Sequence, residues 1–260
     1  MKKKSVLPVL ILAGIVIFFY LPLVVLVVNS FNASRVSSVW GGFSLKWYER
    51  LFSDQNLLRS VKNTVLVTGI SVLCSTVLGS LAGISIARFK SRLQKVHSVF
   101  IALPLIMPDI LIGISLLLFF ISFRIRLSLL TIIIGHITFC VSYVASTVQA
   151  RFQNFDFSLI EAAQDLGAGK GQILWKIYLP LLAPGILSGA MLAMTLSLDD
   201  FIISFFTAGP GASTLPIQIY SMIRHGSPPV INALSTLFIA FTFIVLLFYQ
   251  RISRRLNNEN

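Results

Sequence analysis

Long apolar runs dominate this chain and restrict what it can fold into. Several stretches of 18 or more residues carry almost no charge, and a helix of about 20 such residues crosses the hydrocarbon core of a bilayer. Hydrophobic residues make up 56% of the chain and charged residues only 12%, whereas about a quarter of a soluble domain is charged. The sequence therefore predicts an all-α integral membrane protein.

Six apolar segments are long enough to span a bilayer. They cover residues 6–28, 61–87, 96–123, 127–150, 182–206 and 230–249. No stretch is left for a separate soluble domain, so residues 1–260 are predicted to form one transmembrane domain. If the N-terminus is cytoplasmic, 13 of the 21 Lys and Arg residues fall in cytoplasmic segments. The positive-inside rule then favours a multi-pass protein with both termini in the cytoplasm.

The formal charge of +12 does not indicate nucleic-acid binding. Lys and Arg gather beside the cytoplasmic ends of membrane helices, and acidic residues are scarce because they are costly inside a bilayer. Cys74 and Cys140 lie in apolar segments without the spacing of a metal site, so we interpret both as small packing residues. The expected partner is the lipid bilayer, with no nucleic acid and no metal.

One polar segment, residues 158–180, separates the fourth and fifth spans on the cytoplasmic side. It reads SLIEAAQDLGAGKGQILWKIYLP. Ser158 and Glu161 have the spacing of a capping box, which predicts a helix beginning at Ser158. Gly167 suits the end of this helix, and Pro180 would close a second short helix before the fifth span.

The same segment is amphipathic. Helical spacing puts four apolar residues on one face of the first predicted helix: Leu159, Ala162, Ala163 and Leu166. Two interpretations remain open. The apolar face either lies in the lipid headgroups as a simple connector, or docks onto a cytoplasmic partner.

The fixed positions of this segment match a spaced pattern. They have the form EAA-x3-G-x9-I-x-L-P, and the segment resembles the EAA loop of ABC-importer permeases. The resemblance implies a type I ABC-importer permease fold, in which the loop docks onto a separate ATP-hydrolysing subunit. It assigns this coupling role to Glu161, Ala162, Ala163, Asp165, Leu166, Gly167, Ile177 and Pro180.

Further motifs extend the resemblance over nearly the whole chain, to the second permease subunit of spermidine/putrescine (polyamine) importers. These motifs are NSFN at 29–32, KWY at 46–48, MPDI at 107–110, GHITFC at 135–140, LSLDD at 196–200 and IYSMI at 219–223. One departure follows Gly167, where Lys170 makes the loop more basic than the acidic family version. This puts any role for an acid at that position in doubt.

The resemblance also implies a set of partners in a bacterial cytoplasmic (inner) membrane. They are a homologous second permease subunit, two copies of a cytoplasmic ATPase and an extracytoplasmic polyamine-binding protein. The chain itself would be a transport subunit and not an enzyme. It would hold no cofactor, and ATP and Mg²⁺ would act on the partner ATPase.

Three acidic residues lie within the predicted spans: Asp109, Asp199 and Asp200. A carboxylate in hydrocarbon is costly, so each needs a polar cavity or a partner. Asp109 follows Pro108 and Pro104, which loosen a helix and free backbone carbonyls. Carboxylates facing a pathway suit a polycation, provided that they are few and partly solvated. Alternatively, the acids only bond to neighbouring helices.

The other pathway candidates are weaker. Adjacent helix residues point about 100° apart, so only one of Asp199 and Asp200 is expected to face the pathway. We favour Asp199, by the resemblance and because Ser197 is its only near polar neighbour. His136 is either a packing or a pathway residue. Three aromatic residues are candidates for cation–π contacts, or else for packing: Tyr20, Trp47 and Tyr220.

Three alternative functions are open. An intramembrane aspartyl protease also needs two aspartates, but no Gly-x-Gly-Asp precedes Asp109 or Asp199. A membrane scaffold predicts that Asp109→Leu is tolerated. An ABC permease for another cation, an amino acid or an iron chelate keeps the coupling loop and changes the cargo, while the internal acids argue against an anion.

Overall fold

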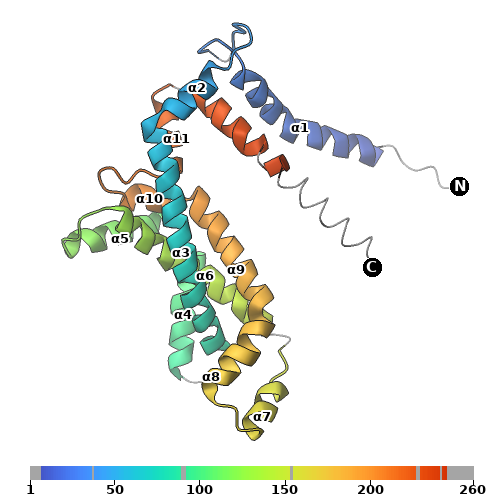
Figure 1. Ribbon diagram of the computed structural model, residues 1–260, viewed down its shortest axis with the longest axis vertical. Coiled ribbons are helices and arrows are strands. Elements are labelled where there is room, and N and C mark those ends of the chain that lie inside the picture. Colours follow the sequence, from blue (N-terminus) through green and yellow to red (C-terminus); the bar gives the residue numbers. More distant parts are fainter. Residues whose placement is uncertain are drawn as a thin grey trace, which may run out of the picture. The chain divides into compact units, whose positions relative to one another are not determined.

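The computed structural model describes residues 7–36, 38–88, 92–152, 155–226, 229–240 and 242–244. Within these ranges the regular elements are helices, and pairing between strands is limited to one isolated antiparallel bridge, Asn32 with Phe43. The all-α prediction is therefore confirmed. The chain forms two compact units, one of Met1–Leu58 with Gln218–Asn260 and one of Arg59–Ile217 (Figure 1).

The first unit begins with helix α1 (Leu7–Ser30), which is apolar on all sides. None of the side chains in its apolar window is buried, as suits a helix that meets lipid or another subunit. Helix α2 (Lys46–Ser53) follows and buries Trp47 and Leu51. A further apolar helix, Pro229–Ile244, belongs to the same unit.

Asn32 organises the loop between α1 and α2. Its side-chain Nδ2 donates to the carbonyl of Val39 (2.8 Å), and its Oδ1 accepts from the amide of Gly41 (2.8 Å). The Trp47 indole Nε1 donates to the Asn32 carbonyl (2.7 Å). A buried amide that satisfies both of its polar ends in this way fixes the conformation of the loop.

The second unit holds most of the helices. They are α3 (Gln55–Arg88, which begins in the first unit), α4 (Arg92–Ile106), α5 (Asp109–Ser122), α6 (Leu129–Arg151), α7 (Ser158–Asp165), α8 (Lys170–Ile173), the π-helix η2 (Leu174–Tyr178), α9 (Leu179–Asp199), α10 (Ile202–Thr207) and α11 (Leu215–Arg224, which ends in the first unit). Helices α6 and α9 lie side by side, and α7 and α8 lie at the end of α9 remote from α10 (Figure 1).

The core of this unit is closely packed around α6. Cys140, Val144, Val148 and Leu182 are fully buried, and the Cys140 thiol approaches the carbonyl of Ala193, which agrees with a packing role. Small residues let membrane helices approach each other closely. Glycines on α3 and α9 pack against α6 in this manner.

Substitution of one of these glycines should destabilise the fold. A Cβ on Gly79 would lie 2.6 Å from the Val144 Cβ and 2.9 Å from the Val141 carbonyl oxygen. We expect Gly79→Ala to cost about 1–3 kcal/mol, because overpacking outweighs the gain in helix propensity. Gly69→Ala, in the same helix with no atom within 4 Å, is the matched control and should be neutral or stabilising. Thermal unfolding in detergent measures both, and equal midpoints for the two variants would contradict this packing.

The number of membrane spans is smaller than predicted when only straight helices are counted. Four helices are long and apolar enough to cross a membrane, and a bent helix pair makes a fifth. The sixth predicted span, 230–249, lies partly outside the described residues. A shorter apolar helix, Pro229–Ile244, covers part of it. Six spans therefore remain a prediction.

Candidate functional site

The third predicted span is not one straight helix. Its two parts, Lys95–Ile106 and Asp109–Ser122, meet at 113°. Pro108 lies between the two helices with an extended backbone (φ −59°, ψ 136°), and its ring and missing N–H favour a break at this position. The segment predicted as a span over 96–123, with its helix loosened by prolines, is therefore a bent pair of helices, and Asp109 begins helix α5.

The fifth predicted span is interrupted as well. Helix α9 ends at Asp199, the backbone of Asp200 is extended (φ −61°, ψ 119°), and α10 begins at Ile202. The prediction of a continuous helix over 182–206 is therefore wrong. The argument that Asp199 and Asp200 point 100° apart also fails, because Asp200 is not helical. The corner between α9 and α10, not helical periodicity, sets the direction of both carboxylates.

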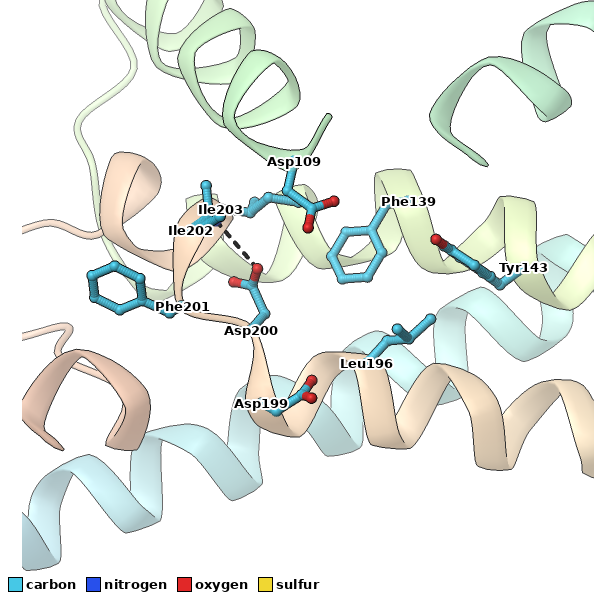
Figure 2. A pocket seen from close by; sticks show the side chains of 9 residues that line it. All are labelled: Asp109, Phe139, Tyr143, Leu196, Asp199, Asp200, Phe201, Ile202 and Ile203. Carbon is cyan, nitrogen blue, oxygen red and sulfur yellow. Dashed lines mark hydrogen bonds between the residues drawn. The ribbon is translucent and has the colours of Figure 1, made fainter. Parts of the chain in front are cut away.

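The two interruptions meet around one cavity (Figure 2). Its volume is about 430 Å³, and α5 and α10 pack closely beside it, with a Phe206 ring carbon 2.8 Å from where a Cβ on Gly113 would lie. The lining residues are Asp109 from α5, Phe139 and Tyr143 from α6, Leu196 and Asp199 from α9, and Phe201, Ile202, Ile203 and Asp200 from the corner and α10. The cavity therefore brings together all three acids that the sequence singled out.

The carboxylates of Asp109 and Asp199 are exposed. Among the described residues, no hydrogen bond or ion pair occupies either one. The cavity walls beside them are aromatic, from Phe139, Tyr143 and Phe201. Two unpaired carboxylates next to aromatic faces can hold an organic cation, through charge pairing and cation–π contacts.

Asp200 lies in a different environment, although it adjoins Asp199. Its side chain is 8% exposed, and its Oδ2 lies 3.1 Å from Nε2 of His136, which is 1% exposed. His136 is absent from the cavity lining and lies behind the wall, as the packing interpretation of this residue expected. The preference for Asp199 over Asp200 agrees with this difference in exposure.

The three aromatic candidates belong to the other unit of the chain, and the cavity lining does not include them. Tyr20 is exposed on α1, and Tyr220 is exposed on α11. Trp47 is buried, and the Lys46 ammonium lies over its ring, 4.6 Å from the ring centroid. These contacts support the packing interpretation of Trp47, while pathway roles for the two tyrosines remain predictions.

Sequence reasoning missed the apolar and aromatic walls. Phe139 and Tyr143 are three and seven residues after His136 on α6, so helical spacing puts all three on one face. Phe201, Ile202 and Ile203 directly follow the aspartate pair. The helical spacing of Phe139 and Tyr143 was present in the sequence, whereas the position of residues 201–203 in the cavity wall depends on the corner at Asp200.

The segment predicted to be a cytoplasmic coupling loop begins differently from the prediction. Ser158 is the first residue of α7, and the N-cap residue is Phe157, whose side chain makes no capping hydrogen bond. The Asp156 carboxylate accepts a hydrogen bond from the Ser158 amide (2.9 Å). Hydrogen bonding from Ser158 lowers the pKa of Asp156, which keeps this exposed carboxylate ionised. The predicted Ser158–Glu161 capping box is therefore wrong, because the helix starts one residue too early for it.

The end of α7 agrees with the prediction. Gly167 has φ +80°, its amide donates to Gln164 O, and the Ala168 amide donates to Ala163 O, both at 2.9 Å. These two bonds form a Schellman motif, which needs a residue in the left-handed region. Gly167 meets that requirement without steric cost.

The second part of the segment does not stop at Pro180. Residues Lys170–Asp199 form one helical stretch of 30 residues, in which the π-helix η2 precedes Pro180. A π-turn widens the backbone ladder locally, so the proline ring and its missing N–H are accommodated without a break. The prediction that Pro180 closes a separate helix is therefore wrong.

The buried face of α7 also differs from the predicted one. Ile160 is buried at 2% exposure, and Ala163 packs against the core, whereas Leu159 and Leu166 are exposed, Leu166 at 89%. Most of the predicted apolar face therefore points away from the protein. Six of the residues assigned to coupling are exposed: Glu161, Ala162, Asp165, Leu166, Gly167 and Pro180.

Comparisons with known proteins agree with this architecture. Residues 75–258 match the family model described as binding-protein-dependent transport system inner membrane component. The spermidine/putrescine transport system permease protein PotC of Escherichia coli (strain K12) is 37% identical over 243 residues, which are 94% of this chain and 92% of that protein. The putrescine transport system permease protein PotI of the same strain is 39% identical over 235 residues, 88% of this chain and 84% of that protein.

Solved structures share the fold. A bacterial ABC transporter that imports the acidic polysaccharide alginate matches with a TM-score of 0.75 at 19% identity, over 96% of this chain and 98% of that chain. The MetNI methionine ABC transporter, in inward-facing conformations, matches with a TM-score of 0.61 at 22% identity, over 76% and 94%.

The chain therefore belongs to the family of inner-membrane components of binding-protein-dependent transport systems. It is a permease subunit of an ABC importer, a multi-pass membrane protein that transports and does not catalyse a reaction. The resemblance indicated by the sequence motifs is confirmed, and the protease and scaffold alternatives are excluded.

Proposed function

We propose that this permease carries polyamines, spermidine or putrescine, across the cytoplasmic membrane. The observation that carries the proposal is the cavity with the unpaired carboxylates of Asp109 and Asp199. It occurs in a chain whose relatives at 36–39% identity are spermidine/putrescine and putrescine permeases. An acidic cavity suits a cation and opposes an anion, so the alginate importer is a guide to the fold alone.

The chemistry of the cavity fits a flexible polycation. Ammonium groups are strongly hydrated, and carboxylates replace part of the water that they lose. The methylene stems between them can lie on apolar walls such as Leu196 and Phe139. Since only two free acids face the cavity, the cargo is held loosely enough to leave again, as conduction requires.

The proposed topology has six spans, with both termini in the cytoplasm and the whole chain as one transmembrane domain. The positive-inside distribution, with 13 of 21 Lys and Arg residues in cytoplasmic segments, supports it. In this orientation α7 and α8 face the cytoplasm.

The proposed partners are a homologous second permease subunit, two copies of an ATPase that use ATP and Mg²⁺, and an extracytoplasmic polyamine-binding protein. This chain itself would need no cofactor. The ATPase would dock onto the exposed residues of α7, among them Glu161 and Leu166. The exposure of the apolar Leu166 supports a docked partner at this surface.

The 30-residue helical stretch Lys170–Asp199 gives this proposal a mechanical link. It begins three residues after Gly167, which ends the α7 turn, and it ends at an acid of the cavity. A rigid helix of this length spans about 45 Å. Movement of α7 when the ATPase closes would therefore be transmitted to Asp199, and would switch the access of the cavity from one side to the other.

Uptake competition tests the cargo. Cells that lack their own polyamine importers, and that express the complete transport system with its binding protein, should accumulate labelled putrescine or spermidine. An excess of unlabelled lysine, arginine or a ferric chelate should not compete. Efficient competition by one of these compounds, with poor polyamine uptake, would assign another cationic cargo to the same ABC permease.

A further inference from the structure

We propose that Asp200 is a positioning residue that does not bind the cargo. Together with His136 it fastens the corner between α9 and α10, and thereby directs the neighbouring Asp199 into the cavity. This inference rests on the proposed function, because it assigns cargo binding to Asp109 and Asp199 and a structural role at the cavity wall to Asp200.

The Asp200 carboxylate accepts hydrogen bonds from protein donors on both of its oxygens. Its Oδ1 accepts the amide of Ile203 (3.2 Å), and its Oδ2 accepts the amide of Ser204 (2.8 Å). Both amides belong to the first turn of α10, where they have no partner within the helix. Asp200 thus caps α10 from the corner itself (Figure 2 shows the bond to Ile203).

His136 ties this cap to the rest of the unit. Its Nε2 lies 3.1 Å from Asp200 Oδ2 and 2.9 Å from the Ser204 hydroxyl. Its Nδ1 lies 2.8 Å from the Ser197 hydroxyl, which donates to the Thr68 hydroxyl (3.1 Å). One buried network therefore joins α3, α6, α9 and α10 beside the cavity, and such satisfied networks hold a single arrangement of their helices.

Hydrogen-bond directions make His136 a donor within this network. Because Ser197 gives its only hydroxyl hydrogen to Thr68, Nδ1 of His136 donates to Ser197. Its Nε2 lies within hydrogen-bond distance of Asp200 Oδ2 and of the Ser204 hydroxyl. Protein groups therefore contact both oxygens of the Asp200 carboxylate, which leaves it less available to a cargo ammonium.

Asp199 shows the opposite arrangement. It is exposed, and within the described residues its carboxylate has no hydrogen bond or ion pair. It is the last residue of α9, so its direction depends on how the chain leaves that helix. The bonds of Asp200 to α10 and His136 fix this exit. A substitution of Asp200 should therefore change the direction of the Asp199 side chain.

The two roles predict different tolerance for an amide. A cap needs an oxygen acceptor, which asparagine supplies, whereas pairing with an ammonium needs the charge. At equal amounts of assembled complex, Asp200→Asn should keep polyamine uptake within about threefold of wild type, and Asp200→Leu should lose at least about tenfold. Asp199→Asn should also lose at least about tenfold. His136→Gln, which keeps a donor, should resemble Asp200→Asn, and His136→Leu should resemble Asp200→Leu.

Carbodiimide labelling of the purified complex, read by mass spectrometry, separates positioning from a purely structural role. Asp199 should be labelled in wild type and protected by spermidine, whereas Asp200 should stay unlabelled with or without spermidine. Protection of Asp199 should persist in Asp200→Asn and disappear in Asp200→Leu. Asp200 itself should become reactive in His136→Leu.

Several results would overturn the inference. They are labelling of Asp200 that spermidine prevents, uptake by Asp200→Asn as poor as that by Asp199→Asn, and equal uptake by Asp200→Asn and Asp200→Leu. If the wild-type complex hydrolyses ATP but carries no polyamine, the proposed cargo fails. The reactivity of Asp200 in wild type and in His136→Leu, measured without cargo, still decides whether Asp200 and His136 hold the corner between α9 and α10.

Discussion

Asp109→Asn and Asp199→Asn should each reduce ATP-dependent polyamine uptake by at least about tenfold, with the complex assembled. A hydrogen bond to a charged group contributes about 1.5–3 kcal/mol, and about 1.4 kcal/mol is a factor of ten. Asparagine has nearly the same shape, so the loss reports the charge. Initial rates of uptake, corrected for the amount of complex in the membrane, measure it.

Asp156→Asn is the matched control for these two variants. Asp156 is an exposed acid outside the cavity, and asparagine keeps the oxygen that accepts the Ser158 amide. Its uptake should stay within about twofold of wild type, since surface charges contribute little. Asp109→Leu adds a second test, because a residue without a transport role would tolerate it. Full uptake by Asp109→Asn or Asp109→Leu would show that the cavity acid does not meet the cargo.

Glu161→Lys should separate ATP hydrolysis from transport. Glu161 is exposed in the first turn of α7, where a negative charge is favourable and a lysine is unfavourable beside the helix N-terminus. A docked ATPase would meet the reversed charge directly. We expect uptake to fall at least about tenfold, because like-charge contacts at an interface cost several kcal/mol, and stimulation of the ATPase by the loaded binding protein to disappear.

A control for net charge is Glu49→Lys, on the exposed side of α2 in the other unit. It makes the same change in charge and should leave the basal ATP turnover of the complex unchanged. Glu161→Gln should have an intermediate effect. Wild-type uptake together with wild-type ATPase stimulation in Glu161→Lys would remove α7 from the coupling pathway.

The sequence predicted the helical class, helix α7 and its glycine turn, because these depend on local patterns. Apolar run length indicates helices in membranes, and Gly167 occupies the position at the end of α7 that needs a positive φ. Both features can be read without knowing any distant contact.

The features that the sequence did not predict depend on contacts between distant residues. Hydropathy is continuous across Pro108 and Asp200, so it does not reveal that both helices break there. Asp200 is held by His136, 64 residues earlier, and the acceptor for the Ser158 amide is Asp156, outside the EAA pattern. The spacing rule that separated Asp199 from Asp200 assumed a regular helix, and the extended corner at Asp200 removed its basis.

ATP-driven accumulation in proteoliposomes tests the central claim most directly. The complete complex, with this permease, its partner subunits and the binding protein, would be reconstituted and offered labelled spermidine and putrescine, with Asp109→Asn and Asp199→Asn alongside. We expect accumulation by wild type that requires ATP on the side of the ATPase, and loss of accumulation in both variants. ATP hydrolysis without accumulation of either polyamine would contradict the proposed cargo, and equal accumulation by the variants would contradict the acidic cavity as its pathway.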